Sequence, residues 1–416
     1  MKKKTVAVIL SAMLAAGLGA CGSSTASTSS AGNSSSAASS TAASSSSTEA
    51  SSSATGSSET ASASADSSEA VVSSSTTSSS SGTDEILSKG PNGEKAVNAS
   101  TIQLTDEQIA KVKEGNYKAA ICLHYGGNDW STSQQKGLED TFKELGIEVV
   151  AVTDANFSAE QQTSDIETVM AKDPDVIVSI PTDATATSDA YKKAAEAGIK
   201  IVFMDQPANN MEAGKDYVSV VSADNYGNGY YSGTIMAESL GGKGKIGMVY
   251  YDADFRPTNQ RDEGFRDAIK NYPGIEIVTE QGFTDENGCS EQADAILTQY
   301  PDIDGIYASW DIPLEGVLSS VRAAGKEGQI VLTANDLGNN LAKEIAAGTV
   351  AGVGAQMPYE QGVAEAKLAA LSLLGEDCPT YVAVPAKKVT HDNVLQAYKD
   401  VYHVEDPEWL TEAYKD

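Results

Sequence analysis

The segment DVIVSIPTDATATSDAYKKAAEAGIKIVFMDQ, residues 175–206, decides the fold class. Two short apolar runs, 175–181 and 200–206, lie on either side of a stretch with helical spacing. When a helix joins two buried strands, the strands lie parallel in the sheet, because the helix provides the crossover connection that parallel strands need. The segment therefore predicts one strand–helix–strand unit of an α/β fold.

The same pattern continues along most of the chain. Further apolar runs alternate with helical stretches at 118–125, 147–154, 217–224, 245–252, 275–283, 305–310, 329–336 and 350–358. Continuous apolar strands between helices are typical of parallel sheets covered on both faces. About ten strands are many for one small domain, and the pattern restarts near residue 244. We therefore predict two similar Rossmann-like α/β lobes.

The start of the chain has the composition of a secretory signal. Lysines at 2–4 precede an uncharged apolar run, 5–20, which is too short for a transmembrane helix. The run ends in LGAC at 18–21, which resembles the bacterial lipoprotein box, where the cysteine thiol is acylated. The resemblance implies a signal peptide at 1–20 and a lipidated Cys21 that anchors the protein to the outer face of the cytoplasmic membrane. An ordinary signal that contains a cysteine by chance is the alternative.

The next segment, 21–95, is predicted to be a disordered serine-rich linker. Residues 22–82 contain no lysine or arginine, and their only large apolar residues are Val71 and Val72. Such a segment cannot bury enough apolar surface to offset the chain entropy lost on folding. As a flexible coil it would reach roughly 40–45 Å root-mean-square, so we expect it to tether the lobes at a distance from the membrane.

Charge and cysteine usage exclude several classes of partner. The formal net charge of −29 and the isoelectric point near 4.4 argue against nucleic acid and anionic lipid headgroups. Apart from Cys21, the chain has Cys122, Cys289 and Cys378, an odd and widely spaced set that is neither a disulfide framework nor a zinc site. We therefore expect no metal and no cofactor.

The predicted strands end in polar or aromatic residues. These are His124, Tyr125, Asp154, Asp205, Gln206, Asp224, Asn225, Asp252, Trp310, Asp311, Asn335, Asp336 and Gln356. Ligands of open parallel sheets bind beyond the carboxyl ends of the strands. Helix capping is the alternative for any one aspartate, and we expect it at Asp224 or Asn225. Capping does not explain Trp310 or Gln356, so we predict a cleft between the facing lobes.

The chemistry of these residues suits an uncharged, hydroxyl-rich ligand. Candidate contacts are the acids Asp205 and Asp336, the amides Asn128, Gln206, Asn259, Asn335 and Gln356, and the aromatic rings of Trp130 and Trp310. A hydroxyl both donates and accepts, and the C–H face of a sugar ring packs on an indole. An anionic ligand would need a cation; the nearest candidates are Arg256 and Arg261, and we interpret Arg261 as structural. A cationic amine is the rival ligand class.

Several motifs in order resemble a known family over about 117–390. They are HYGGNDWSTSQQKG, IPTDATATSDAYKKAAEAGIKIVFMD, VSADNYGNG, RDEGF, IYASWD, LTAND and AQMPYEQG. In this order they resemble the type I periplasmic sugar-binding proteins of the ribose-, galactose- and allose-binding kind, which feed ABC importers. Autoinducer- and polyol-binding proteins belong to the same branch, so the motifs leave the ligand open.

The resemblance implies an architecture. The first lobe would comprise 117–223 and 357–385, the second 224–356 and 386–416, with hinges near 223–226, 354–358 and 384–388. Sugar bridging the lobes would favour the closed state, which would dock on a membrane permease with its ATPase. We expect a monomer. The C-terminal stretch lies beyond the resemblance.

In the first lobe, the resemblance assigns a ligand amide to Asn128, a stacking aromatic ring to Trp130 and a ligand acid to Asp205. His124 is a further candidate contact, with a structural role as the alternative. Three positions depart from the ribose-binding pattern, namely Ser131 in place of an aromatic residue, Ile180 in place of an amide and Gln206 in place of an arginine.

In the second lobe, Asp336 matches the second ligand acid and Gln356 matches a glutamine near the hinge. Asn259 falls where many members have an arginine, and Trp310 falls where ribose binders have an asparagine. With the arginines replaced, the pattern puts ribose in doubt and leaves a hexose, a disaccharide or a polyol open.

A surface glycoside hydrolase is the rival class of function. Asp205 and Asp336 could form a catalytic pair. However, the chain has no G-x-S-x-G elbow, and its histidines, His124, His391 and His403, are scattered rather than spaced as metal ligands. A repeat of two lobes is better explained by binding, so we predict a receptor rather than an enzyme.

Overall fold

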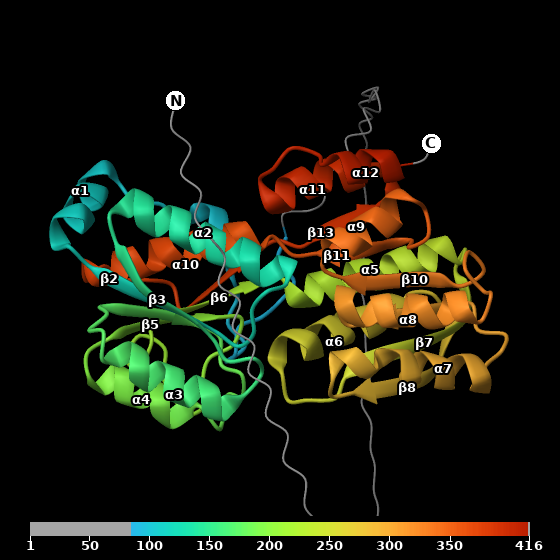
Figure 1. The fold of residues 1–416 in the computed structure, drawn as a ribbon, viewed down its shortest axis with the longest axis horizontal. Coiled ribbons are helices and arrows are strands. Elements are labelled where there is room, and N and C mark those ends of the chain that lie inside the picture. The colour runs from blue at the N-terminus through green and yellow to red at the C-terminus, as the bar shows by residue number, and fades with distance from the viewer. Residues whose placement is uncertain (1–84, 415–416) are drawn as a thin grey trace, which may run out of the picture. The chain divides into compact units, whose positions relative to one another are not determined.

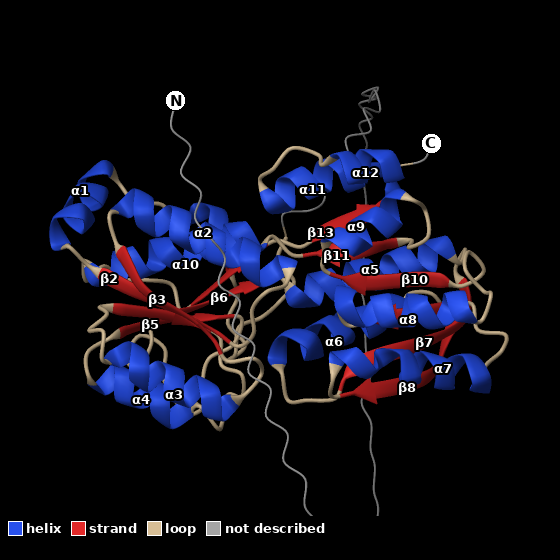
Figure 2. Cartoon of the chain, in the orientation of Figure 1, coloured by secondary structure: helices blue, strands red, loops and turns tan. Residues whose placement is uncertain are grey.

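The computed structural model describes residues 85–414. The predicted signal peptide, the lipidation site Cys21 and most of the predicted linker lie outside the described residues. Within 85–414 the chain forms two β-sheets, each flanked by helices (Figures 1 and 2). The two sheets and their helices confirm the predicted α/β class with two lobes.

The first sheet has seven strands, all paired in parallel. In spatial order they are β1 (Val97–Asn98), β12 (Tyr381–Val384), β6 (Ser219–Ala223), β5 (Lys200–Met204), β4 (Val176–Ser179), β2 (Lys118–Leu123) and β3 (Glu148–Asp154). Helices α1 (Asp106–Gly115), α2 (Asp129–Leu145) and α10 (Pro358–Leu373) cover one face, and α3 (Ala159–Met170) and α4 (Ser188–Glu196) cover the other. We call this sheet with its helices the first lobe.

The second sheet has six strands, and only β13 runs antiparallel to its neighbour. In order they are β13 (Lys387–Thr390), β11 (Gly352–Ala355), β10 (Val331–Asn335), β9 (Gly305–Ala308), β7 (Lys243–Tyr251) and β8 (Gly274–Phe283). Helices α5 (Asn225–Ser239) and α6 (Arg256–Lys270) cover one face, and α7 (Cys289–Gln299), α8 (Asp311–Ala323), α9 (Asn339–Ala346), α11 (Val394–Tyr402) and α12 (Glu408–Ala413) cover the other. This is the second lobe.

Alternate residues of the central strands pack on opposite faces of each sheet. In β2, Ile121 belongs to the cluster under α2 and α10, whereas Cys122 belongs to the cluster under α3 and α4. Both faces are therefore apolar, which explains the continuous hydrophobic runs in the sequence. A strand lies in or overlaps each of the ten predicted runs, so that prediction is confirmed. The strand–helix pattern does not predict the short strands β1, β12 and β13, because no such alternation surrounds them.

The two lobes repeat one strand order. The first five strands of the repeat are β2–β6 in the first lobe and β7–β11 in the second, and both run in the order second, first, third, fourth, fifth. The order reverses between β2 and β4 and between β7 and β9, where the loops diverge and leave room for a ligand. Ligand-facing loops should therefore follow these strands.

The chain passes between the lobes three times. It crosses from β6 to α5, from β11 to α10 and from β12 to β13. At the first crossing Asp224 caps α5 by accepting a hydrogen bond from the Gly227 N–H, which confirms the predicted capping role. The same carboxylate accepts hydrogen bonds from the backbone N–H groups of Leu87 and Ser88, so the end of the predicted linker packs at this crossing.

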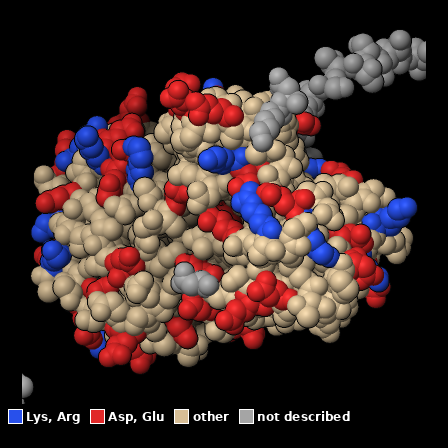
Figure 3. All heavy atoms as spheres, turned by 45° about the vertical axis from the view of Figure 1, so that its right-hand side comes forward, with Lys and Arg blue, Asp and Glu red and all other residues tan. Residues whose placement is uncertain are grey.

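Acidic side chains are spread over the face drawn in Figure 3, with fewer basic ones between them. This distribution agrees with the net charge of −29. Among residues 85–414, no helix is both long and apolar enough to cross a membrane.

Candidate functional site

A pocket lies between the lobes beyond the carboxyl ends of their strands. Its lining residues are His124, Tyr125, Trp130, Phe157, Ile180 and Asp205 from the first lobe and Tyr251, Phe255, Pro257, Thr258, Arg261, Trp310, Asp336 and Gln356 from the second lobe and its crossings. The loops after β2, β4, β7 and β9, at the two reversals of strand order, all contribute to it. The repeated topology therefore places one pocket where both lobes meet.

Asp205 and Asp336 occupy equivalent positions in the two lobes. Asp205 follows β5 and Asp336 follows β10, the fourth strand of each repeat, and both have left-handed backbone angles with φ of 54° and 70°. Each also donates its backbone N–H to the fifth strand, to Val221 O at 2.8 Å and to Gly354 O at 3.0 Å. Aspartate tolerates this conformation better than most residues. The repeat thus turns one carboxylate from each lobe toward the pocket.

The Asp205 carboxylate is held in place from several sides. Its Oδ1 accepts hydrogen bonds from the Ser222 hydroxyl at 2.9 Å, the Ala223 N–H at 3.2 Å and the Asn225 amide at 3.1 Å. Its Oδ2 accepts one from the Gln361 amide at 3.3 Å. Burial raises the pKa of Asp205, and the Arg261 charge and the hydrogen bonds from Ser222 and Gln361 oppose that rise. Because Oδ2 accepts only this one hydrogen bond from the described residues, it retains capacity to accept another from a ligand hydroxyl.

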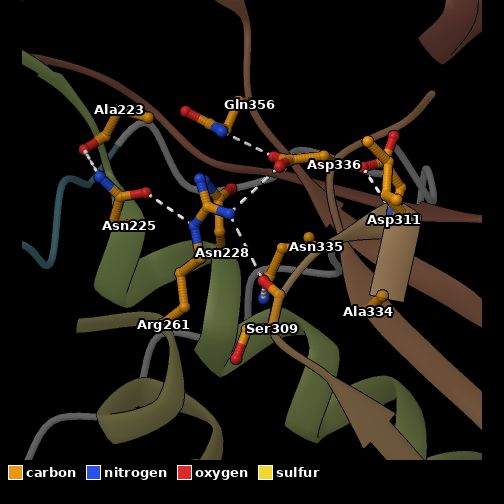
Figure 4. Close-up of polar contacts among 12 residues, drawn as sticks. Ala223, Asn225, Asn228, Arg261, Ser309, Asp311, Ala334, Asn335, Asp336 and Gln356 are labelled. Carbon is orange, nitrogen blue, oxygen red and sulfur yellow. Dashed lines mark hydrogen bonds and ion pairs between the residues drawn. The ribbon is translucent and has the colours of Figure 1, made fainter. Parts of the chain in front are cut away.

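Arg261, on α6, ties the polar floor of the pocket together (Figure 4). It donates to Asp336 Oδ2 at 3.1 Å and to Asn225 Oδ1 at 2.9 Å, and Gln356 donates to Asp336 Oδ1 at 2.7 Å. Burial acts to lower the pKa of Arg261, but the Asp336 and Asp205 carboxylates raise it above its ordinary value. The guanidinium is thus engaged by the protein's own carboxylates, which leaves the site unsuited to an anionic ligand.

Aromatic rings form the walls. The imidazole of His124 stacks on Phe255 at 5.6 Å between centroids and meets the rings of Trp130 and Phe157 edge-on. Burial lowers the pKa of His124 to about 3, so its imidazole is neutral at physiological pH. Trp310, in the second lobe, packs edge-on against Tyr251 at 5.5 Å. The pocket offers flat apolar surfaces from both lobes.

Three buried polar atoms on the pocket wall have no hydrogen-bond partner within residues 85–414. They are His124 Nδ1, Trp130 Nε1 and Gln356 Oε1. The Trp310 indole instead interacts with Glu286: burial raises the pKa of that carboxyl, and the indole N–H opposes the rise. A buried polar atom without a partner costs free energy unless a ligand or water satisfies it. The Trp130 indole N–H donates, the amide oxygen accepts and the imidazole nitrogen can do either. The site is therefore complementary to a molecule that both donates and accepts.

Four predicted contacts do not line the pocket. Asn128 caps α2 by accepting from the Ser131 N–H at 2.7 Å, and Asn335 bonds to Tyr307, Ser309 and Ser232 inside the second lobe. The Asn259 side chain is exposed on α6. Gln206 accepts a hydrogen bond from the Arg256 N–H at 3.0 Å and donates to Pro181 O, so it joins the lobes beside the pocket.

The most informative residues absent from the predicted set are Phe157 and Arg261. Phe157 follows β3 by a loop in which both Asn156 and Phe157 have positive φ, so its position depends on a turn that the sequence pattern does not reveal. The sequence indicates a structural role for Arg261, and the structure shows that it also lines the pocket. The sequence contained a signal for this position, because Arg261 begins the RDEGF motif about one helical turn after the loop that follows β7. No cluster of three or more possible metal-ligating side chains occurs in residues 85–414.

The comparisons with known proteins agree with this geometry. A family model described as periplasmic binding protein domain matches residues 119–377. The ribose import binding protein RbsB of Bacillus subtilis is 29% identical over 202 residues, which are 48% of this chain and 64% of that protein. The D-ribose/D-allose-binding protein of Pseudomonas aeruginosa is 28% identical over 271 residues, covering 63% of this chain and 83% of that protein.

A solved structure has the same fold. An ABC transporter periplasmic solute binding protein from Actinobacillus succinogenes, with bound D-allose, is 26% identical with a TM-score of 0.62. The likeness covers 67% of this chain and 99% of that one. The family match spans most of the described chain and includes strands of both lobes. The chain therefore belongs to the periplasmic binding protein family, in the type I branch that includes the ribose- and allose-binding proteins.

Proposed function

We propose that the protein is the substrate-binding lipoprotein of an ABC importer and that it captures a neutral sugar or polyol between its lobes. The observation that carries this proposal is the set of unpartnered buried polar atoms on the pocket wall, contributed by both lobes. Sugar hydroxyls satisfy donors and acceptors alike, and the C–H face of a ring packs on the aromatic walls. Relatives with ribose, allose and arabinose in their names or titles support this ligand class.

Capture would proceed by closure of the lobes about the three crossings. Polar contacts such as the Arg256 N–H to Gln206 bond join the lobes next to the pocket. A ligand that contacts Trp130 and Asp205 on one lobe and Trp310 and Asp336 on the other favours the closed state, because it gains those contacts only there. The closed protein would then deliver the sugar to a membrane permease and its ATPase.

A screen of sugars and polyols tests the ligand class. A ligand stabilises the folded form by mass action, by about 2.7 kcal/mol at a hundredfold excess over its Kd. We expect at least one of D-ribose, D-allose, D-arabinose, D-galactose, their common disaccharides or myo-inositol to raise the melting temperature, with a stoichiometric heat in calorimetry. The protein should retain the sugar unchanged. Turnover of an oligosaccharide would instead indicate a hydrolase, and no response to any carbohydrate would refute the proposal.

The anchor would be the acyl chains on Cys21. Full-length protein expressed in a bacterium should fractionate with membranes, and Cys21→Ser should release it into the soluble fraction. Membrane retention of the Cys21→Ser variant would contradict the anchor.

A cationic amine is the second candidate ligand, on one specific observation. The acids Asp205 and Asp336 line the pocket together with the rings of Trp130 and Trp310. Carboxylates and aromatic faces both attract a cation. Matched pairs such as D-galactose and D-galactosamine separate the candidates, because only an amine site prefers the aminated sugar.

A further inference from the structure

Three polar side chains are buried where α2 crosses α10 in the first lobe. They are Gln134 on α2 and Gln361 and Glu365 on α10, and none has exposed surface. The helices approach closely because glycines lie at the crossing. A Cβ at Gly362 would come within 2.3 Å of the Gln134 carbonyl oxygen. The two closely packed helices thus enclose the three side chains, which lie together away from the surface.

Their hydrogen bonds leave an excess of acceptors. Gln134 Nε2 donates to Glu365 Oε1 at 2.7 Å, and Gln361 Nε2 donates to Val221 O at 3.1 Å and to Asp205 Oδ2 at 3.3 Å. The atoms without a partner are Gln134 Oε1, Gln361 Oε1 and Glu365 Oε2, and all three are oxygens. An ionised Glu365 can only accept, so it leaves every one of them unsatisfied. A neutral carboxylic acid supplies the missing donor.

We propose that Glu365 is held as a neutral acid that donates its proton to Gln361 Oε1, and that this bond orients Gln361 toward Asp205. Residues four apart on a helix are neighbours, so Glu365 and Gln361 lie within reach on α10. The Gln361 amide is the group that donates to Asp205 Oδ2. Glu365 is therefore a positioning residue for a carboxylate of the pocket, and its link to sugar binding rests on the function proposed above.

The electrostatic surroundings agree with this assignment. Burial raises the pKa of Glu365 well above its usual range, and the Asp205 charge at the end of β5 raises it further, whereas the hydrogen bond from Gln134 opposes the rise. Asp205 is the charged group that acts on Glu365, and α2 presents the uncharged Gln134. Arg261, which partly balances Asp205, acts on that carboxylate from the second lobe. No cation within residues 85–414 favours ionisation of Glu365 directly.

A ligand-free experiment tests the buried proton. The pKa of Glu365 is higher in the folded than in the unfolded protein, so the folded state holds more protons between the two values and its stability falls as pH rises through that window. Glu365→Gln supplies a permanent donor and acceptor without a titration. We expect the folding equilibrium constant of the wild type to fall at least about tenfold relative to Glu365→Gln between pH 5 and pH 8, in urea unfolding.

The exposed Glu139 of α2 provides the matched control, because Glu139→Gln also removes one carboxylate from this helix pair. The ratio of the folding equilibrium constants of the wild type and Glu139→Gln should vary much less with pH over the same range. If the ratio of the folding equilibrium constants of the wild type and Glu365→Gln stays constant from pH 5 to pH 8, the proposal is overturned.

A binding experiment tests the positioning role separately. With the sugar from the panel above that binds most tightly, wild-type affinity should weaken toward high pH, while Glu365→Gln should lose that pH dependence. Glu365→Leu, which has neither donor nor acceptor, should bind at least about fivefold more weakly than Glu365→Gln at pH 6. Identical pH profiles for the wild type and Glu365→Gln would refute the positioning role. If the unfolding result holds and no carbohydrate binds, the proposed function fails and the buried acid stands.

Discussion

The carboxylate of Asp129 on the first lobe accepts two hydrogen bonds from Asn339 on the second, one from the backbone N–H at 2.8 Å and one from the side-chain amide at 2.8 Å. Tyr398 of α11 donates to the Asn339 side-chain oxygen and so buttresses this contact. The C-terminal helices, which lie beyond the resemblance to the family, thus support a bond between the lobes. This bond can form only when the lobes are close together.

Asp129→Ala should therefore weaken ligand binding by accelerating release. Hydrogen bonds to a charged group contribute about 1.5–3 kcal/mol. In the open state water solvates Asp129 and Asn339, which reduces the net contribution of the bond to closure. We therefore expect at least about a tenfold faster dissociation. Stopped-flow fluorescence with the bound sugar measures it. Asp106→Ala is the control, because it also removes an acid from the first turn of a first-lobe helix, and that helix, α1, lies on the side of the first lobe away from the second (Figure 1). Equal dissociation rates for both variants would exclude a closure bond.

The Trp130 indole N–H in the pocket should donate to the ligand. Trp130→Phe retains an aromatic wall and removes the donor, so it should cost about 0.5–1.5 kcal/mol of binding free energy. Trp310→Phe should cost less, because the Trp310 indole already interacts with the Glu286 carboxylate. Tyr117→Phe is the control, because it removes an aromatic donor that bonds to the Leu373 carbonyl oxygen outside the pocket. Calorimetric titration measures all three. A wild-type affinity in Trp130→Phe would mean that the ligand does not use this donor.

The elements that sequence reasoning locates are those fixed by a local pattern. The strands of the two repeats are found because their residues are apolar on both faces. Asp205 and Asp336 are found because each directly follows an apolar strand, and the resemblance to the family assigns them as candidate ligand acids. The rest depends on contacts between distant segments. The sequence does not show that the Asn128 side-chain oxygen caps α2, or that the Asn335 amide bonds within the second lobe, so neither could be recognised as lying outside the pocket. Glu365 and Gln361 have the pattern of ordinary helix-surface residues, and only the packing of α2 over α10 buries them.

The pair formed by Arg261 and Asp336 should be essential for stability. Both side chains are largely buried, and the removal of one partner leaves an uncompensated buried charge, which typically costs about 3–5 kcal/mol. Arg261→Gln should lower the free energy of unfolding by that amount at pH 7. Arg266→Gln on the same helix breaks the partly exposed ion pair with Glu280 and should cost about 0–1 kcal/mol.

The loss in Arg261→Gln should also depend on pH. Burial raises the pKa of Asp205 and the Arg261 charge opposes that rise, so without the guanidinium the Asp205 carboxylate binds its proton more tightly in the folded state. The variant should therefore regain stability relative to the wild type as pH falls toward 4. Urea unfolding at pH 4.5 and 7 provides the measurement. A deficit that does not shrink at the lower pH would mean that lost packing, rather than unpaired charge, destabilises the variant.

Phe157 places an aromatic ring at the mouth of the pocket at a cost to its backbone. Its φ is 59°, its side chain is 40% exposed, and its ring stacks on Tyr125 at 4.2 Å between centroids. A left-handed conformation costs a non-glycine residue about 1–2 kcal/mol. An exposed ring held at such a cost indicates a binding role rather than a packing role.

Substitution by alanine and by glycine separates the two contributions. Both Phe157→Ala and Phe157→Gly remove the ring and should weaken sugar binding to a similar degree, about twofold to tenfold for the loss of one aromatic contact. Phe157→Gly should nevertheless be more stable to unfolding than Phe157→Ala by at least about 0.5–1 kcal/mol, because glycine adopts positive φ freely. Asn116, which has a φ of 52° at the end of α1 and lies away from the pocket, should show the alanine-to-glycine difference in stability without any change in affinity. An affinity unaffected by loss of the Phe157 ring would leave its strained backbone without a role in binding.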